Sequence, residues 1–299
     1  MPIEDYNNIE FGICTNYGEP NIVRIPIDNS VKQFLYEMHE EFNKTYIGIN
    51  GNPELYQASE KYSTTEKLYI PLNNEYLTSL RDLFFLDSIP ITNVEISEIA
   101  SSIVYYFAIF RNNNGLKKIA FKRPSTFKGL LKKKLIHFID DTLKVVNEKV
   151  FNLDNDFDFI IHNDNINILH PVGFNFIAKI EYEILRSAAE TTMQLAVRLT
   201  FVNFAYISDF VRNSKTAAKL ISSIKSRDDL ENISQEKLIE KCNRVGVQFQ
   251  ENNGLITPDQ GQILRFLEIL DRRGYDFDIL NDNIIEIYVA TSRKRLGPF

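Results

Sequence analysis

The chain of 299 residues contains no tryptophan, only two cysteines and no long apolar run. Cys14 and Cys242 lie far apart and lack the spacing of a zinc site, which argues against bound zinc and excludes a disulfide framework. The longest apolar run, Ile103–Phe110, has eight residues, whereas a membrane-spanning helix needs about 20. The N-terminal stretch MPIEDYNN has no basic region followed by an apolar one, so we expect no signal peptide. These features predict a cytoplasmic protein that would reach the inner membrane only through a partner.

Several motifs of catalytic chemistry are also missing from the sequence. There is no GxxxxGK[ST] and no GxGxxG, which argues against a nucleotide hydrolase and a dinucleotide-dependent enzyme. The histidines stand apart from any serine, cysteine or aspartate at the spacing of a catalytic triad. We therefore assign no catalytic residue, no metal ligand and no cofactor. The histidines are His39, His137, His162 and His170.

One segment of the chain, from Arg111 to Ile139, carries nine basic residues and no acidic one, although the protein as a whole has a net charge of -6. Outside that segment, 25 basic residues stand against 40 acidic ones. We call the stretch from Arg111 to Ile139 the basic segment. Its basic residues are Arg111, Lys117, Lys118, Lys122, Arg123, Lys128, Lys132, Lys133 and Lys134.

A concentrated patch of cations in an acidic protein favours a polyanionic partner. Lysine and arginine on such a surface would contact DNA phosphates without reading the base sequence, and binding would weaken as salt is raised. No helix-turn-helix or zinc finger is visible, so direct base reading is not expected. The plain alternative is a solvated surface, because lysines at sheet edges also prevent strands from pairing between molecules. Arg293, Lys294 and Arg295 form a second, smaller basic cluster.

The order of the predicted elements indicates an α+β fold, with a β-rich meander in the N-terminal half and a mainly helical C-terminal half. We divide the chain into a mixed α/β region at 1–98, a β-meander at 99–170 and a mainly helical region with a late strand at 171–299.

In the first region, strands are predicted at Ile9–Cys14, Ile22–Ile27 and Pro90–Ile96. Ser30 and Gln33 match a capping box, which predicts that a helix begins there. A second helix is predicted over Asn74–Phe85.

In the meander, Ile103–Phe110 is apolar on both faces, as in a buried strand, and Asn114-Gly115 favours a tight turn into a strand at Leu116–Arg123. On that strand, Ile119 and Phe121 share one face while Lys118 and Lys122 share the other. Residues 131–146 fit either a helix or two strands, 135–139 and 143–146. The strands are favoured because β-branched residues flank an Asp-Asp turn. A further hairpin is predicted over 157–170.

Helical spacing takes over from residue 173, and Ser234 is expected to begin one helix. Thr257 and Pro258 suggest the start of a later one. A last strand is predicted over Phe277–Val289. One stripe of apolar residues could pack inside the protein or face a second subunit: Leu195, Leu199, Val202 and Tyr206.

An acidic cluster lies just before and within the predicted hairpin of the meander. Asp154, Asp156, Asp158 and Asp164 could hold Mg²⁺ for phosphodiester cleavage, and alternation along a strand would place the first three on one face. Neither a Glu-x-Lys nor a His at a suitable spacing follows them, and carboxylates at turns and strand edges are common. We therefore favour a structural role, with Asp158 accepting hydrogen bonds from backbone N–H groups. Phe121, Phe127 and Tyr105-Tyr106 could stack on bases, although core positions are favoured for them.

The block from Phe121 to Phe176 resembles the KwaB-like family, the cytoplasmic component of the bacterial Kiwa anti-phage system. A basic strand and a short meander lead into Phe157-Asp158, then the strand Ile166–Leu169, then an aromatic helix start at Phe174–Phe176. Many family members have Phe-Glu where this chain has Phe174-Asn175, so no carboxylate role is carried over there. The chain length and the order of its halves also match.

The resemblance implies a DNA-binding effector that interferes with phage DNA and acts with a membrane-embedded Kiwa partner. A homo-oligomer, most simply a dimer, is the expected assembly. Two other functions remain open from the sequence. One is a metal-dependent nuclease using Asp156 and Asp158. The other is a protein-interaction adaptor whose basic segment meets acidic loops or anionic lipid head groups rather than DNA.

Overall fold

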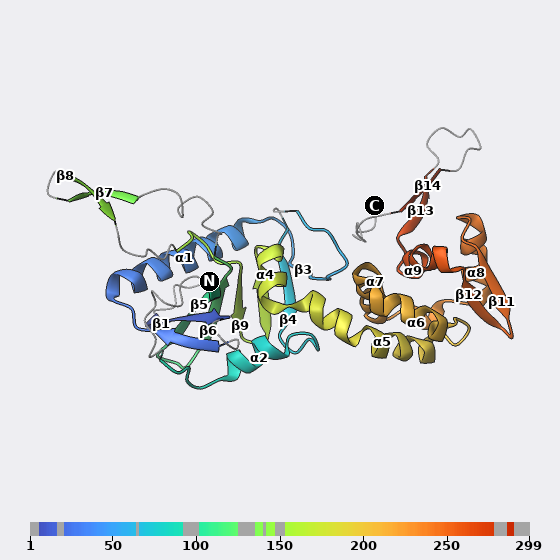
Figure 1. Cartoon of the computed structure of the whole chain (residues 1–299), viewed down its shortest axis with the longest axis horizontal. Helices are drawn as coiled ribbons and strands as arrows, with labels where there is room; N and C mark the ends of the chain where they lie inside the picture. The colour runs from blue at the N-terminus through green and yellow to red at the C-terminus, as the bar shows by residue number, and fades with distance from the viewer. Residues whose placement is uncertain are drawn as a thin grey trace. The chain divides into compact units, whose positions relative to one another are not determined.

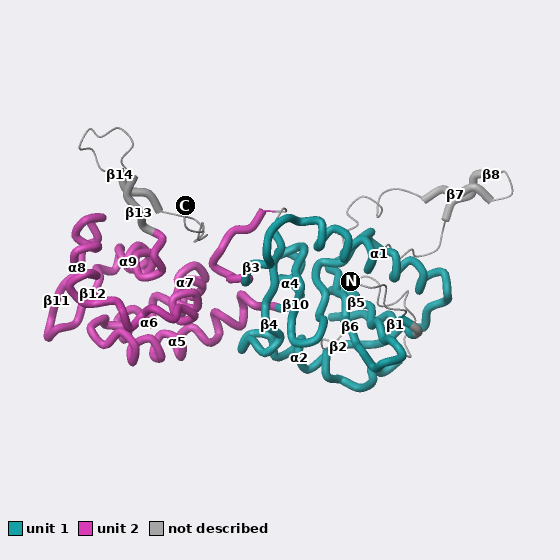
Figure 2. Tube along the Cα trace, turned by 180° about the vertical axis from the view of Figure 1, so that it is seen from behind, with its two compact units in different colours: residues 1–55, 64–178 teal, residues 56–63, 179–299 magenta. Residues whose placement is uncertain are grey.

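The computed structural model describes residues 6–16, 21–63, 66–91, 102–124, 135–139, 142–146, 153–277 and 286–289. The chain forms two compact units, shown in different colours in Figure 2. Unit 1 comprises Met1–Leu55 and Thr64–Ala178, and unit 2 comprises Tyr56–Ser63 and Lys179–Phe299. Unit 1 is built on a large sheet and unit 2 is mostly helical, so the predicted α+β class, β-rich first and helical second, is confirmed.

Unit 1 contains an eight-stranded sheet in the order β2-β1-β5-β6-β9-β10-β4-β3 (Figure 1). Every neighbouring pair in the sheet is antiparallel except β3 with β4. The strands are β1 (Tyr6–Thr15), β2 (Asn21–Ile25), β3 (Glu54–Leu55), β4 (Leu68–Pro71), β5 (Ile103–Asn112), β6 (Lys117–Lys122), β9 (Phe159–His162) and β10 (Asn165–Ile168).

The β5–β6 hairpin forms as the sequence predicts. The side chain of Asn112 accepts hydrogen bonds from the backbone N–H groups of Asn114 (3.0 Å) and Leu116 (2.8 Å), and Gly115 has a φ of +77°. Of the predicted Asn114-Gly115 pair, only the glycine takes a positive φ, because the Asn112 side chain supports the turn. The β9–β10 hairpin is also confirmed.

Helices cover both faces of the central strands. The α1 helix (Asn29–Gly48) places Leu35, Met38 and Phe42 against the face that includes Tyr106 and Phe110. On the other face Phe121 stacks on Phe159, whose ring meets Phe174 of α4 (Pro171–Ala178) edge-on at 5.1 Å between centroids. Side chains in the middle of β5 and β6 are therefore buried whichever face they take, whereas those at the strand ends are half-buried.

Two predicted helix starts in unit 1 change position. Asp28, rather than Ser30, caps α1 by accepting from the backbone N–H of Val31 at 2.9 Å, because the helix already includes Asn29 and Ser30. Gln33 pairs instead with Glu37, one turn along the helix. The second predicted helix is α2, which begins later than expected and runs over Thr78–Phe85. Most of the predicted strand Pro90–Ile96 lies outside the described residues.

The described parts of residues 131–146 form two strands. β7 (Leu135–Ile139) and β8 (Thr142–Val146) pair antiparallel as a separate hairpin, with Ile139 opposite Thr142. The favoured strand interpretation is confirmed, and the helical alternative is wrong.

Unit 2 has five longer helices in its described part, and Ser234 caps one of them as predicted, accepting from the N–H of Lys237. Leu195, Leu199 and Val202 are buried in this unit, whereas Tyr206 is exposed on the next helix, so the four do not form one stripe of a single helix. The helices are α5 (Ile180–Arg198), α6 (Phe204–Asn213), α7 (Lys215–Lys225), α8 (Gln235–Arg244) and α9 (Ile263–Leu270), with short 3-10 turns η2 (Leu230–Asn232) and η3 (Gln260–Gln262).

Two further predictions for unit 2 are wrong. Thr257 and Pro258 end a strand rather than begin a helix, because β12 (Leu255–Pro258) pairs with β11 (Phe249–Asn252). The single late strand is two strands, β13 (Gly274–Phe277) and β14 (Glu286–Val289), which pair antiparallel. In both places a strand nearby in the sequence pairs with the segment to form a hairpin, and this pairing replaces the predicted element.

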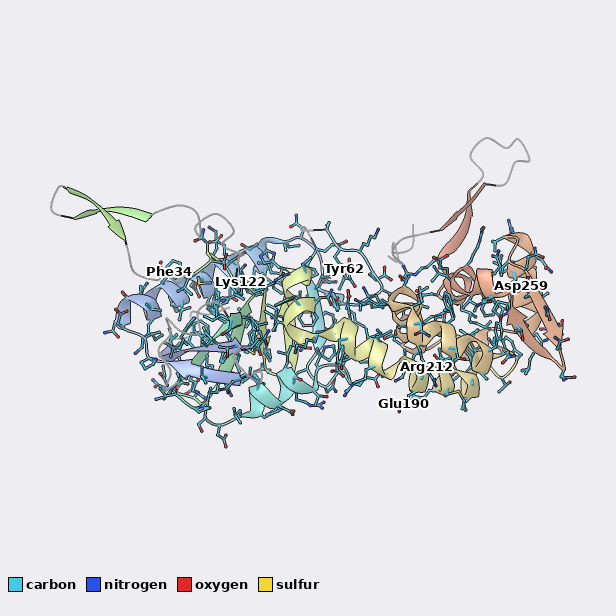
Figure 3. All side chains as sticks on the ribbon, in the orientation of Figure 1. Phe34, Tyr62, Lys122, Glu190, Arg212 and Asp259 are labelled. Carbon is cyan, nitrogen blue, oxygen red and sulfur yellow. The ribbon has the colours of Figure 1, made fainter. Side chains whose placement is uncertain are left out.

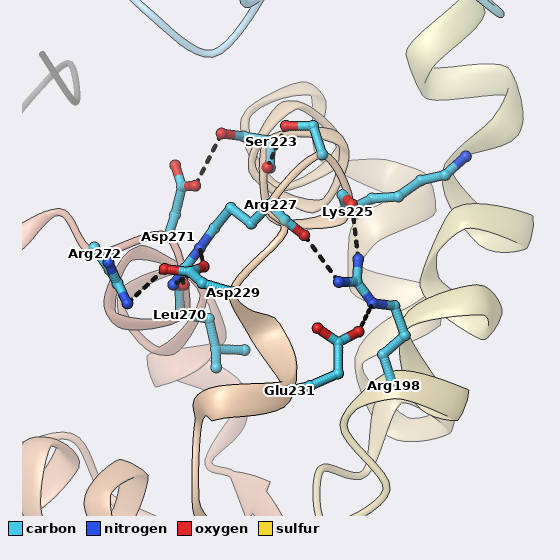
Figure 4. A network of polar contacts seen from close by, with 10 residues as sticks. Arg198, Ser223, Lys225, Arg227, Asp229, Glu231, Leu270, Asp271 and Arg272 are labelled. Carbon is cyan, nitrogen blue, oxygen red and sulfur yellow. Dashed lines mark hydrogen bonds and ion pairs between the residues drawn. The ribbon is translucent and has the colours of Figure 1, made fainter. Parts of the chain in front are cut away.

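The short segment Tyr56–Ser63 belongs to unit 2 through a buried polar network (part of it in Figure 4). The Ser223 hydroxyl lies within hydrogen-bond distance of Oδ1 of Asp271 (2.8 Å) and Oε1 of Gln57 (3.1 Å). Arg273 pairs with Asp271 at 2.7 Å and with Glu60 at 3.4 Å. Asp271 and Arg273 are buried, so these partners satisfy charges that water does not reach.

Candidate nucleic-acid interface

Five of the nine cations of the basic segment lie in the described part of the chain, on or beside β5 and β6. The other four are Lys128, Lys132, Lys133 and Lys134, which lie outside the described residues, as do Phe127 and the cluster Arg293–Arg295. The five described cations differ in their burial and in their contacts.

Arg111 and Lys117 face each other across the turn end of the β5–β6 hairpin. The Lys117 ammonium donates to the carbonyl oxygens of Phe84 (2.6 Å) and Leu86 (2.9 Å), where helix α2 ends. A cation there satisfies carbonyls that the helix leaves unpaired and interacts favourably with its dipole. Burial and the nearby Arg111 lower the pKa of Lys117. Arg111 itself reaches the carbonyl of Asp87 at 3.4 Å.

Lys118 is buried, with 4% of its surface exposed. It lies opposite Phe110 in the β5–β6 register, on the face that α1 covers, and its ammonium is 5.2 Å from the centroid of the Tyr6 ring. Strand alternation correctly separates Lys118 from Ile119, but the face it takes belongs to the core. Lys118 is therefore not presented to a partner.

Lys122, labelled in Figure 3, lies on the same face of β6 as Lys118. It meets two carboxylates. Its ammonium lies 2.7 Å from Oδ1 of Asp156 and 3.3 Å from Oδ1 of Asp158. Burial would lower the pKa of Lys122, but the charges of Asp158 and Asp156 outweigh it and raise that pKa. Lys122 thus neutralises acidic residues of its own chain.

Asp158, of the Phe157-Asp158 pair, joins three parts of unit 1. Its side chain accepts from the backbone N–H of Arg123 at 2.7 Å, and its backbone carbonyl accepts from the N–H groups of Leu169 and His170. The predicted role as an acceptor of backbone N–H groups is confirmed. Burial raises the pKa of Asp158, against the opposing effects of Lys122 and the Arg123 N–H.

Helix α4 comes close to Asp158 at Gly173. A Cβ at that position would lie 2.2 Å from the carboxylate of Asp158, so only glycine fits there.

Asp156 lies between Lys122 and His170. The ring Nε2 of His170 is 2.6 Å from Oδ2 of Asp156, so both carboxylate oxygens have a close partner. Burial would raise the pKa of Asp156, but the hydrogen bonds from His170 and Lys122 outweigh it and hold the pKa at about 2. Asp154 instead exchanges hydrogen bonds with the hydroxyl of Tyr106.

The acidic cluster does not lie on a strand, which corrects the predicted alternation. Residues 153–158 precede β9 as irregular chain, and Asp156 and Asp158 come together because both meet Lys122. Among the described residues, no group of three or more His, Cys, Asp or Glu side chains is placed to hold a metal ion.

Arg123, where β6 ends, is the exposed member of the described cations. Its guanidinium lies 4.0 Å from the centroid of the Phe176 ring on α4, a distance at which a cation and an aromatic face attract each other. Phe176 is 40% exposed and Val172, one turn earlier, 73% exposed. The sequence motif includes Phe176 as part of the aromatic helix start but does not mark it as a site residue. Helical spacing could have found it, because Phe174 and Phe176 cannot both face the core of one helix.

Three of the aromatic residues considered for base stacking are described, and all three take core positions. Phe121 and Tyr106 have no exposed surface and Tyr105 is buried. In the described chain, the aromatic ring that meets the exposed cation Arg123 is instead that of Phe176.

The described cations are spread along β6 rather than gathered at one point. Lys117 and Arg123 lie at opposite ends of the strand, roughly 20 Å apart at the usual rise per residue. The four lysines at 128–134 follow the Arg123 end directly in sequence. Arg123 and Phe176 therefore mark the described edge of the candidate interface.

None of the helices in the described part of the chain is both long and apolar enough to cross a bilayer.

Comparison with known proteins identifies the family. The sequence model of the family described as Kiwa protein KwaB-like matches residues 101–279, more than half of the chain. No curated protein and no solved structure matches the chain. The matched region contains the β5–β6 hairpin, the Asp158 junction and most of unit 2. The chain therefore belongs to the KwaB-like family of the Kiwa defence system, as the resemblance over residues 121–176 predicts.

Proposed function

We propose that this protein is a non-catalytic DNA-binding effector of anti-phage defence. The observation that carries the proposal is the acid-free basic segment within an acidic member of the KwaB-like family. Lysine and arginine side chains that neutralise phosphates release counterions, which favours binding to any DNA sequence.

The contacts of the described residues divide the basic segment by role. Lys117 binds the end of α2, Lys118 is buried beneath Tyr6, and Lys122 neutralises Asp156 and Asp158. These three lysines stabilise the fold in our proposal. The DNA contacts are assigned to the exposed Arg123 and to the lysines that follow it, Lys128, Lys132, Lys133 and Lys134. The Phe176 ring beside Arg123 would then lie at the edge of the DNA.

The proposed partners follow from the family. DNA is bound through its phosphate backbone, and a membrane-embedded Kiwa protein brings the effector from the cytoplasm to the inner membrane. The effector acts as a homodimer. Leu195, Leu199 and Val202 are buried within unit 2. The proposed dimer surface therefore lies elsewhere on the molecule.

The contacts of Asp156 and Asp158 favour binding over cleavage. Their carboxylates meet Lys122, His170 and the N–H of Arg123 at distances from 2.6 to 3.3 Å. A cation held by the same oxygens would have to displace an ammonium group that is already neutralising them.

The test uses two duplexes of equal length and unrelated sequence, titrated with the purified full chain over a range of salt concentrations. We expect equal affinities and a steep fall in affinity with salt, by about 0.9 in the logarithmic slope for each phosphate neutralised. A flat salt dependence, or no binding, would contradict the proposal. Incubation with plasmid and Mg²⁺ or Mn²⁺ should leave the plasmid intact. Cleavage that is lost in Asp158→Asn would instead support the nuclease.

A further inference from the structure

A cavity of about 430 Å³ opens in unit 2, away from the basic segment. Its walls come from η2, α8 and the end of α9, together with Arg227 and Arg272. Small-molecule sites commonly have volumes of roughly 300–1,000 Å³, so the space suits a ligand rather than a single water.

The charge on this cavity has one sign. Four of its ten described lining residues are cationic and none of the ten is acidic: Arg227, Lys237, Lys241 and Arg272. Lys237 and Lys241 are one turn apart on α8 and are both exposed. Within the described part of the chain, neither of these two ammonium groups has a carboxylate within ion-pair distance.

Asp229 holds the two arginines in place (Figure 4). One of its oxygens is 2.7 Å from the Arg227 guanidinium and the other is 2.6 Å from that of Arg272. Arg227 is buried and also donates to the carbonyl of Leu270, at the end of α9. The single charge of Asp229 offsets one of the four cations, so an excess of positive charge remains around a fixed guanidinium.

The rest of the lining is mostly aliphatic. Leu238 and Leu270 are buried, and Ile269 is half-buried beside them. None of the ten described lining residues is aromatic. Nucleobases are usually held by stacking on aromatic rings, so this wall suits an alkyl chain better than a base.

We propose that this cavity binds a small alkyl phosphomonoester. Its phosphate, with close to two negative charges near neutral pH, is held by Lys237, Lys241 and Arg272, and its alkyl chain lies against Leu238 and Ile269. Neither the DNA-binding role nor the family assignment is needed for this site.

The test measures binding of octyl phosphate and of inorganic phosphate to the full chain by calorimetry. Octyl phosphate should bind at least about tenfold more tightly, because burial of the chain adds apolar contact that the bare anion lacks. Ile269→Asn should weaken octyl phosphate and leave inorganic phosphate unchanged. Equal affinities for the two ligands, or no binding of either, would overturn the proposal.

Two matched pairs of substitutions test the charge. Lys237→Gln with Lys241→Gln should weaken octyl phosphate by about tenfold or more, since two charge-assisted contacts are lost. Lys44→Gln with Lys215→Gln makes the same charge change at exposed sites elsewhere and should have no effect. Unchanged circular dichroism without ligand will show that the variants fold. An unchanged affinity in the first pair would rule out the site.

The same chemistry could come from a free metabolite or a lipid head group. Phosphatidylcholine vesicles with and without phosphatidate separate the two. Binding to phosphatidate vesicles that octyl phosphate displaces indicates the lipid, and binding to octyl phosphate alone indicates a soluble ligand. If duplex DNA displaces octyl phosphate, the cavity belongs to the DNA-binding surface and the proposal is wrong.

Discussion

The Lys122 ammonium lies 2.7 Å from Oδ1 of Asp156, an ion pair between the basic segment and a carboxylate that follows it in the chain. Removing the ammonium in Lys122→Met would leave Asp156 and Asp158 close together without their shared cation. We expect a loss of roughly 3 kcal/mol in the free energy of unfolding, measured by urea denaturation, because a partly buried charge loses its partner.

The control for this change is Lys44→Met on α1. Lys44 is 82% exposed and lies 3.9 Å from Glu41, so its loss should cost less than about 1 kcal/mol. Equal small effects in both variants would mean that the Lys122 ion pair adds little to stability.

The pH dependence of stability should show how much the ionised Asp156 carboxylate stabilises the fold. Its pKa falls from 3.8 to about 2 in the folded protein, so its contribution is complete above pH 3.8 and is lost as the pH falls toward 2. The size is on the order of 2 kcal/mol. Asp158, whose pKa is raised, contributes with the opposite sign.

Unfolding of the wild type and of Asp156→Asn, followed between pH 6 and pH 2.5, isolates this effect. The stability difference between the two proteins should shrink as the solution is acidified through this window. A difference that stays constant with pH would contradict the assigned contacts.

Gly173 should not tolerate a methyl group. In Gly173→Ala the new Cβ would be placed 2.2 Å from the Asp158 carboxylate, so either α4 or the Asp158 junction must move. We expect a loss of about 3 kcal/mol in unfolding free energy. Gly48→Ala is the matched control, since nothing lies within 4 Å of its added Cβ, and it should be close to neutral.

Arg123 and Lys117 should separate DNA contact from stability. Arg123→Ala is expected to lower affinity for duplex DNA and reduce the salt slope by about 0.9. Lys117→Met is expected to lower the unfolding free energy by about 1–2 kcal/mol through loss of the α2 contacts, with DNA affinity unchanged. The reverse pattern would show that the roles are assigned wrongly.

The sequence predicts the local elements of unit 1 well because short-range chemistry decides them. Asn112–Gly115 forms its turn, and Phe157-Asp158 begins a hairpin that pairs within a few residues. Residues 135–146 form strands as their β-branched composition favours.

What the sequence could not predict depends on distant contacts. Alternation places Lys118 and Lys122 on one face of β6, but it does not reveal that α1 covers that face. The assignment of Tyr56–Ser63 to unit 2 likewise rests on Gln57 meeting Ser223, far along the chain. Only the packing therefore shows which lysine and arginine side chains stabilise the fold and which are exposed.

The central claim is that the lysines following Arg123 bind DNA phosphates. The direct test replaces Lys132, Lys133 and Lys134 with glutamate and follows duplex affinity against salt. A matched variant carries Lys44→Glu, Lys61→Glu and Lys215→Glu, an equal charge change at exposed sites.

Both variants have the same net charge, so only the position of the charges differs between them. We predict that the first loses up to about 2.7 in the logarithmic salt slope, about 0.9 for each contact, while the second keeps a slope close to that of the wild type. Equal slopes in all three proteins would contradict the account.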